Sequence, residues 1–279
     1  IGRAVVAISK ADLVPASEVE EVATDVAALL AELGIAAPAA LATSAFTGAG
    51  IDALAGALGA MAAASPPRAD HGAAWLPIDR AFTIAGHGAV VTGTLHGGAI
   101  APGDRLELLP GGREVRLRGL QVHGRAVERA LPGQRVAANL RDVGAAELSR
   151  GMALAMPASL DPAAWLTLSI RAVADAPALR NGMRLRALAG TAEVDARLRL
   201  LEGDVLEPGE STLAQLHLAE PLALPARTRV ILRQPSPART VAGGVVLEPV
   251  ARRRRRHDAA VLGRLATLRD LPPEAIVAA

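Results

Sequence analysis

The sequence changes character at residues 65–72, where a stretch rich in proline, serine and glycine separates two kinds of apolar pattern. Before it, short apolar runs alternate with longer amphipathic segments. After it, short β-branched or alternating runs are separated by Gly and Pro turns, about every eight to twelve residues. The first pattern is typical of α/β domains and the second of small β-barrels, so the stretch predicts a linker between them.

The part before the linker is predicted to run strand, helix, strand, helix. The strands are the apolar runs at residues 4–8 and 39–42, of the kind buried in parallel sheets. The first helix is expected to open at Ser17 with a capping box and to stop at Gly34. The second helix is expected at residues 51–61.

The part after the linker predicts two all-β blocks. Strands of the first block are expected at residues 76–79, 90–95, 105–109, 114–121 and 135–140. The second block starts at Asp161-Pro162, and its strands are expected at residues 166–171, 191–201, 211–218 and 229–232. Residues 257–271 then predict a helix that has nothing visible to pack on.

Composition excludes several classes of function. Apolar residues make up 51% of the 279 residues and charged residues 21%, which is typical of a globular chain. The four aromatic residues, Phe46, Trp75, Phe82 and Trp165, are too few for a platform that stacks a run of bases. There is no cysteine, which excludes disulfides and thiolate sites, and the six histidines show no metal-ligand spacing.

No membrane segment is expected, because the longest apolar stretch, residues 53–64, is shorter than the roughly 20 residues that span a bilayer.

Two polar loops follow the two expected strands of the α/β part. Ligands bind outside the carboxyl ends of such strands, where Ser9-Lys10-Ala11-Asp12 and Thr43-Ser44-Ala45 lie. The carboxylate of Asp12 could accept hydrogen bonds from N1–H and the exocyclic amine of a guanine, while the stem of Lys10 covers the ring. The backbone N–H groups of Ser44 and Ala45 could donate to the guanine O6. The plainer reading is that Asp12 only caps a turn.

These loops resemble the base-recognition elements of the translational GTPases, usually written NKxD and SA, with Ser9 where Asn is commonest. The resemblance implies a guanine site formed by Ser9, Lys10, Asp12, Ser44 and Ala45, with GTP or GDP as cofactor and Mg²⁺ in the intact protein. It also implies that residues 1–64 are the C-terminal part of a P-loop-type GTP-binding domain and that residues 65–74 are a linker.

The phosphate-binding part of such a domain is missing from the sequence. No segment has the form G-x-x-x-x-G-K-[ST], and Lys10 is the only lysine. Phosphoryl transfer needs that cradle and a magnesium site. We therefore expect no catalytic residue here and no GTP hydrolysis by this chain alone. The resemblance implies that the P-loop and both switch regions lie upstream of Ile1.

Longer segments of the all-β part resemble the selenocysteine-specific elongation factors. Matches to barrel domain II of that family lie at residues 76–82, 86–94, 119–124 and 133–140. Matches to barrel domain III lie at residues 190–194, 208–210 and 213–216. The resemblance implies domain II at residues 75–158, domain III at 159–250, and a basic linker with the start of a helical winged-helix region at 251–279.

In that family the aminoacyl end of the charged tRNA sits against domain II. By motif match, Asp79, Arg80 and Arg135 are the positions that would form the aminoacyl pocket. Two guanidinium groups stabilise an ionised selenol more than a neutral serine hydroxyl, and Asp79 would orient one of them or bind the α-amino group. The plainer reading is a surface salt bridge beside a strand.

The resemblance also implies partners. The parent would bind GTP and deliver selenocysteinyl-tRNA to the ribosome in the cytoplasm for UGA decoding, and would read an mRNA hairpin through a C-terminal region missing here. Five successive arginines, Arg252, Arg253, Arg254, Arg255 and Arg256, are candidates for contact with RNA phosphates.

Two alternatives remain open from the sequence. One is another translational GTPase that delivers ordinary or initiator tRNA, because the arrangement of two barrels is shared. The other is a non-enzymatic protein whose tandem β-barrels bind RNA or a protein partner.

Overall fold

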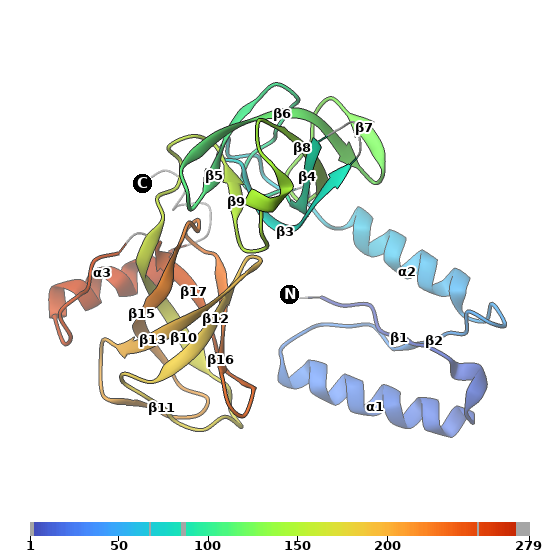
Figure 1. The fold of residues 1–279 in the computed structure, drawn as a ribbon. Helices are drawn as coiled ribbons and strands as arrows, with labels where there is room; N and C mark the ends of the chain where they lie inside the picture. Colours follow the sequence, from blue (N-terminus) through green and yellow to red (C-terminus); the bar gives the residue numbers. More distant parts are fainter. Residues whose placement is uncertain (1–2, 67, 85–87, 250, 272–279) are drawn as a thin grey trace. The chain divides into compact units, whose positions relative to one another are not determined.

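A computed structural model describes residues 3–66, 68–84, 88–249 and 251–271. The chain divides into two compact units, residues 1–67 and residues 68–279, and the division falls inside the expected linker. Each unit is described by itself. Figure 1 shows the ribbon of both, with the helices α1 and α2 in the first unit and the strands β3–β17 in the second.

The first unit has the expected alternation of strand and helix. Strands β1 (Ala7–Ile8) and β2 (Leu41–Ala42) pair in parallel, and η1 (Ala11–Leu13), α1 (Ala16–Glu32) and α2 (Ile51–Ala63) complete it. The expected capping box is wrong: α1 has Pro15 as its N-cap without a side-chain bond, so Ser17 lies inside the first turn. Neither helix buries a residue fully, and apolar side chains such as Leu29 stay exposed.

The first barrel, which we call barrel II, closes with six strands. Their order around the ring is β5-β9-β3-β4-β8-β6, and pairing of β5 with β6 closes it. The short β7 (Arg125–Val127) pairs with the end of β6, and η2 (Ala145–Glu147) precedes β9. The ring strands are β3 (Trp75–Ile84), β4 (Gly88–Thr94), β5 (Arg105–Leu109), β6 (Arg113–Val122), β8 (Arg135–Arg141) and β9 (Ala153–Ala155).

The second barrel, barrel III, is also a closed ring of six strands, in the order β10-β15-β13-β12-β16-β17. A separate pair, β11 (Leu179–Arg180) and β14 (Val205–Leu206), lies outside the ring. The ring strands are β10 (Ala163–Ala172), β12 (Arg184–Ala189), β13 (Ala192–Leu200), β15 (Ser211–Leu222), β16 (Arg229–Gln234) and β17 (Arg239–Glu248).

Alternation along the strands fills both barrels with apolar side chains. In β13, Ala192, Val194 and Ala196 are buried while the intervening Glu193 and Asp195 are exposed, as a period of two requires. Because the interior is closed and filled, polar side chains that could bind a ligand are confined to the outer face and the rims.

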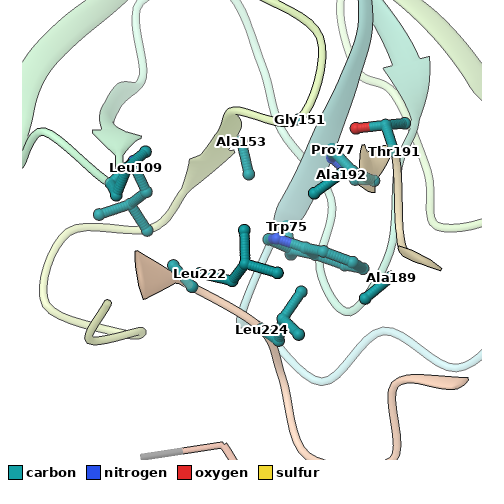
Figure 2. A pocket seen from close by; sticks show the side chains of 12 residues that line it. Trp75, Pro77, Leu109, Gly151, Ala153, Ala189, Thr191, Ala192, Leu222 and Leu224 are labelled. Atoms are coloured by element: carbon teal, nitrogen blue, oxygen red, sulfur yellow. The ribbon is translucent and has the colours of Figure 1, made fainter. Parts of the chain in front are cut away.

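A tryptophan joins the two barrels. Trp75, at the start of β3, is only 6% exposed and belongs to the apolar core of barrel III. Figure 2 shows its indole ring among Ala189, Thr191 and Leu224. Gly190 leaves room for the ring, since a Cβ there would lie 3.0 Å from it. The remaining cavity is only about 10 Å³, so this joint is tightly packed.

The last helix packs against barrel III, contrary to the expectation that it had nothing to pack on. Helix α3 (Ala259–Asp270) begins at Asp258, whose carboxylate accepts from two backbone N–H groups of the first turn. Leu265 is fully buried with Leu201, Leu213 and Leu247 of the barrel. At the other end, Arg227 donates to the carbonyl of Leu268 at 2.9 Å.

Among the described residues, no helix combines the length and the apolar character needed to cross a membrane.

We predict that Trp75→Ala destabilises the second unit by about 3–5 kcal/mol, because it empties a packed joint. Trp165→Ala removes the same ring from a partly exposed position and is expected to cost clearly less. Urea titration followed by circular dichroism measures both. Equal losses for the two variants would contradict the tryptophan joint.

Candidate functional site

The two polar loops of the first unit lie side by side. Backbone hydrogen bonds join them: Ala11 N–H donates to the Thr43 carbonyl at 3.0 Å, and Thr43 N–H donates to the Ile8 carbonyl at 2.8 Å. Lys10 has a left-handed backbone, with φ of 59°, so the first loop turns sharply at this residue. Ser9, Lys10 and Asp12 are exposed and follow the carboxyl end of β1.

Ser44 has a different role from the one expected. Its backbone N–H donates to the Ala49 carbonyl at 2.9 Å, and its hydroxyl oxygen accepts from Thr47 N–H at 3.1 Å. At 1% exposure, the residue builds the turn that follows β2. Its N–H is therefore engaged, and the exposed Ala45 is left to supply the backbone donor of this loop.

A β-bulge in barrel II gathers the charged residues expected there. The register of β3 against β4 shifts between Ile78 and Arg80, so Asp79 is the extra residue. Asp79 accepts a hydrogen bond of 2.6 Å from the hydroxyl of Thr92, and Arg80 stands in register with the same Thr92. A bulge redirects side chains in this way, so Asp79 and Arg80 both reach one outer face.

Arg135 of β8 completes this group. Its Nη1 and Nη2 donate to the two carboxylate oxygens of Asp79 at 2.5 and 3.1 Å, which is a bidentate ion pair. The structure thus brings Asp79, Arg80 and Arg135 together, with Thr92 as a fourth member. We call these four residues the outer charged cluster.

Electrostatics keep the cluster ionised. Burial alone would raise the pKa of Asp79, but hydrogen bonds from Arg135 and Thr92, with the charges of Arg135 and Arg80, outweigh it and lower the pKa. The hydrogen bonds that Arg135 donates to Asp79, with the negative charge of Asp79, in turn raise the pKa of Arg135. One carboxylate faces two guanidinium groups, so the cluster carries one positive charge in excess.

Comparison with known proteins gives the family. Residues 167–253 match the family described as "Selenocysteine-specific elongation factor, beta-barrel domain". The selenocysteine-specific elongation factor of Desulfomicrobium baculatum is 37% identical over 254 residues, which are 91% of this chain and 40% of that protein. The chain belongs to the family of selenocysteine-specific elongation factors. The factor of Escherichia coli strain K12 is 33% identical over 259 residues, again 91% of this chain and 40% of its relative.

Solved structures of this family share the fold. A bacterial selenocysteine-specific elongation factor, EF-Sec, superposes with a TM-score of 0.83 at 22% identity, over 97% of this chain and 44% of that one. The apo form of translation elongation factor SelB from Methanococcus maripaludis gives 0.75 at 21% identity, over 93% and 60%. The chain thus spans about 40% of the length of the Desulfomicrobium baculatum and Escherichia coli relatives.

The five arginines of this elongation-factor chain do not form one solvated run. Arg254 pairs with Glu248 at 3.3 Å, and Arg256 donates to the Leu200 carbonyl at 2.9 Å and to Asp204 at 2.7 Å. These two side chains fix the segment to barrel III. Arg252, Arg253 and Arg255 are exposed, so only these three remain as candidates for RNA contact.

Two polar residues escaped the sequence analysis. Thr92 positions Asp79, and the only signal for it is that alternation along β4 puts a threonine on the outer face. Gln215 is fully buried, and its side-chain amide holds the arginine segment through two hydrogen bonds. No sequence pattern predicts that role. His87, part of an expected motif, lies outside the described residues.

The residues present fit the base of the expected GTP or GDP better than its phosphates. Asp12 offers a carboxylate acceptor and Ala45 a backbone N–H donor for a guanine base, and the two residues lie at the ends of neighbouring strands. The sequence offers no P-loop for the phosphates. Within the described part of the chain, no group of three or more His, Asp or Glu residues is arranged to hold a metal ion.

We predict that Arg135→Gln raises the pKa of Asp79, because the charged hydrogen bonds to the carboxylate are lost. The folded pKa of Asp79 lies below the unfolded value of about 3.9, so its ionisation stabilises the protein above that pH. The contribution disappears as the pH falls through the folded pKa. Carbon NMR titration of the carboxyl group measures the change.

Arg105→Gln is the matched control, because it breaks the exposed pair with Glu114 on the same barrel. It should leave the titration of Asp79 unchanged. A midpoint that stays the same in Arg135→Gln would contradict the importance of the bidentate pair.

Proposed function

We propose that the outer charged cluster of barrel II binds the aminoacyl end of selenocysteinyl-tRNA. The observation that carries this proposal is the bidentate pair of Asp79 and Arg135 with Arg80 on the same outer face. In the sequence Arg135 lies 56 positions after Asp79, and the barrel brings the two together.

The charge balance of the cluster favours an anionic headgroup. With Asp79 neutralising one guanidinium group, the excess positive charge equals the single negative charge of a selenolate. A serine hydroxyl is neutral at the same pH and gains only a neutral hydrogen bond, which is about half as strong as a charged one. Discrimination then follows from charge, because shape alone separates such similar side chains poorly.

The orientation of Arg135 matters as much as its charge. Its two terminal nitrogens already donate to Asp79, which fixes the plane of the guanidinium group before any ligand arrives. Arg80 has no such ion pair among the described residues and is free to donate to a ligand. We infer that Arg80 supplies the direct contact and that the Asp79–Arg135 pair shapes the site.

The first unit is proposed to supply the base contacts of a guanine nucleotide site. Asp12 would accept from N1–H and the exocyclic amine, Ala45 N–H would donate to O6, and Lys10 and Ser9 would flank the ring. Ser44 holds the loop in place through its bonds to Ala49 and Thr47. A bound GTP with Mg²⁺ would supply the timing step of delivery in the whole protein.

The two proposed sites are consistent with one role for the whole protein. We propose that it is a GTP-dependent factor that carries selenocysteinyl-tRNA to the ribosome for UGA decoding and reads an mRNA hairpin through a further C-terminal region. Arg252, Arg253 and Arg255 are proposed to contact RNA phosphates, because their side chains are exposed. This function is supported by the family and by the geometry of the outer charged cluster.

The decisive experiment compares selenocysteinyl-tRNA with seryl-tRNA on the same tRNA body. We predict a preference for the selenium form that falls about ten- to a hundredfold in Arg80→Gln, because a charged hydrogen bond is worth about 1.5–3 kcal/mol. Equilibrium binding near neutral pH measures the ratio of the two affinities.

Arg105→Gln again serves as the control, because it removes one exposed charge from the same barrel and should leave the ratio unchanged. Equal affinities of the unchanged protein for the two tRNAs would refute the proposed specificity.

We predict that guanosine, but not adenosine, shifts the backbone NMR signals of Lys10, Asp12 and Ala45. Nucleosides are the suitable probe, because only base contacts are proposed for this unit. Asp12→Ala should abolish the shifts that guanosine causes, because it removes the carboxylate that would accept hydrogen bonds from N1–H and the exocyclic amine. Guanosine and adenosine differ at these groups. Asp25→Ala, on the exposed surface of α1, is the matched control. Equal shifts with both nucleosides would contradict a guanine site.

A further inference from the structure

The outer face of barrel III carries a hollow that none of the proposed roles uses. It lies over β10, β15 and β13, which are neighbours in the ring, and has a volume of about 320 Å³ (Figure 1 shows the three strands). Trp165, His217 and Arg197 form one row across the three strands by register. Asn181, Arg199 and Arg253 complete the polar lining.

One side of the hollow is an aromatic stack. The rings of Trp165 and His217 have centroids 4.5 Å apart and planes inclined by 24°. The side chain of His217 is exposed, so a further ring can extend the stack. A single stack cannot carry a run of bases, in agreement with the scarcity of aromatic residues, but it can hold one.

The other side is positively charged. Arg197, Arg199 and Arg253 line the hollow, and none of the residues that line it is acidic. Burial, together with the charges of Arg253 and Arg256, lowers the pKa of Arg199, so the group is under like-charge repulsion. Among the described residues, the buried Nε of Arg199 has no hydrogen-bond partner. An anion in the hollow would relieve the like-charge repulsion.

Carboxylates near the hollow are already engaged elsewhere. Glu248 pairs with Arg254 and Arg264, and Asp204 pairs with Arg256. Among the described residues that line the hollow, none is a carboxylate that could neutralise these arginines.

Arg253 is held at the rim before any ligand binds. The buried amide of Gln215 donates to the Arg252 carbonyl and accepts from Arg254 N–H, both at 2.8 Å. Just before this, Ala251 N–H donates to the Trp165 carbonyl at 3.1 Å. These bonds fix the backbone on either side of Arg253, so little backbone conformational entropy remains to be lost there on binding.

We propose that this hollow binds one unpaired nucleotide of a single-stranded RNA segment. The base stacks on the His217–Trp165 pair, and its phosphate is held by Arg197, Arg199 and Arg253. An acidic peptide would satisfy the arginines but would leave the aromatic stack unused, so RNA fits the whole hollow better. The inference extends the RNA contact proposed for Arg253 and is independent of the outer charged cluster.

The test compares an eight-nucleotide RNA without self-pairing with the duplex of the same length. We predict that the single strand binds about tenfold more tightly and quenches the emission of Trp165, while Trp75 stays buried in the joint. Trp165→Ala should weaken binding of the single strand about tenfold, as measured by anisotropy of labelled RNA. Arg197→Gln with Arg253→Gln should lower the salt slope by about one.

Another hollow on barrel III supplies a matched control. It is lined by Arg171 and Arg229 and has no aromatic residue, so Arg171→Gln with Arg229→Gln removes the same charge without touching the stack. This control should keep the preference for the single strand. Equal binding of single strand and duplex, or equal effects of the two double variants, would overturn the inference.

A competition experiment tests the proposed RNA ligand against an acidic peptide. Displacement of the single-stranded RNA by an octaglutamate peptide at equal concentration would show that charge alone fills the hollow, and would overturn the commitment to RNA. None of these outcomes depends on the comparison of selenocysteinyl-tRNA with seryl-tRNA, so failure of this inference is distinguishable from failure of the proposed aminoacyl site.

Discussion

Closure of the two sheets into barrels decides where the second unit of this chain can bind a ligand. Each ring pairs all its strands and fills its interior with apolar side chains, so binding groups must lie on the outer face or at the rims. The outer charged cluster and the hollow over Trp165 are both on such faces. In each, residues from neighbouring strands meet because the register fixes them in rows. The strands thus act as a rigid frame for charged side chains.

The tryptophan joint links these two surfaces. Trp75 begins the strand that carries Asp79 and Arg80, and its ring is buried in the core of barrel III. Large apolar contact at the joint resists relative motion of the barrels, since small shifts in a packed interface cost dispersion contacts. An RNA that touched barrel II at its aminoacyl end and barrel III at another point would meet two sites held at a constant separation.

The sequence predicted the order of elements better than their details. The alternation of apolar and charged residues predicted β13, whereas the sequence did not predict β12 or most of β17. Alanine and arginine dominate β12, and neither is typical of strands. In β17, Gly243-Gly244 reads as a turn, but Gly244 is required there because a Cβ would lie 2.7 Å from the carbonyl of Ser169 on β10.

The sites were predictable to the extent that chemistry follows from residue type. Asp79, Arg80 and Arg135 could be chosen by motif, but the bulge that aligns them depends on the partner strand and leaves no local signal. The aromatic stack was invisible for a similar reason, because Trp165 and His217 are more than fifty residues apart. Pairing across strands, rather than sequence proximity, creates both.

The five successive arginines divide into side chains that anchor the segment to barrel III and side chains that stay exposed. A run of like charges is expected to be solvated, yet its backbone lies against barrel III, where side chains alternate between inward and outward positions. Inward positions require a carboxylate or carbonyl partner to offset desolvation, and Glu248, Asp204 and Leu200 supply them. Outward positions have no such requirement. Because Arg254 and Arg256 are anchored, the backbone of Arg253 and Arg255 between and beside them is also held against barrel III, and their exposed side chains project from a fixed backbone.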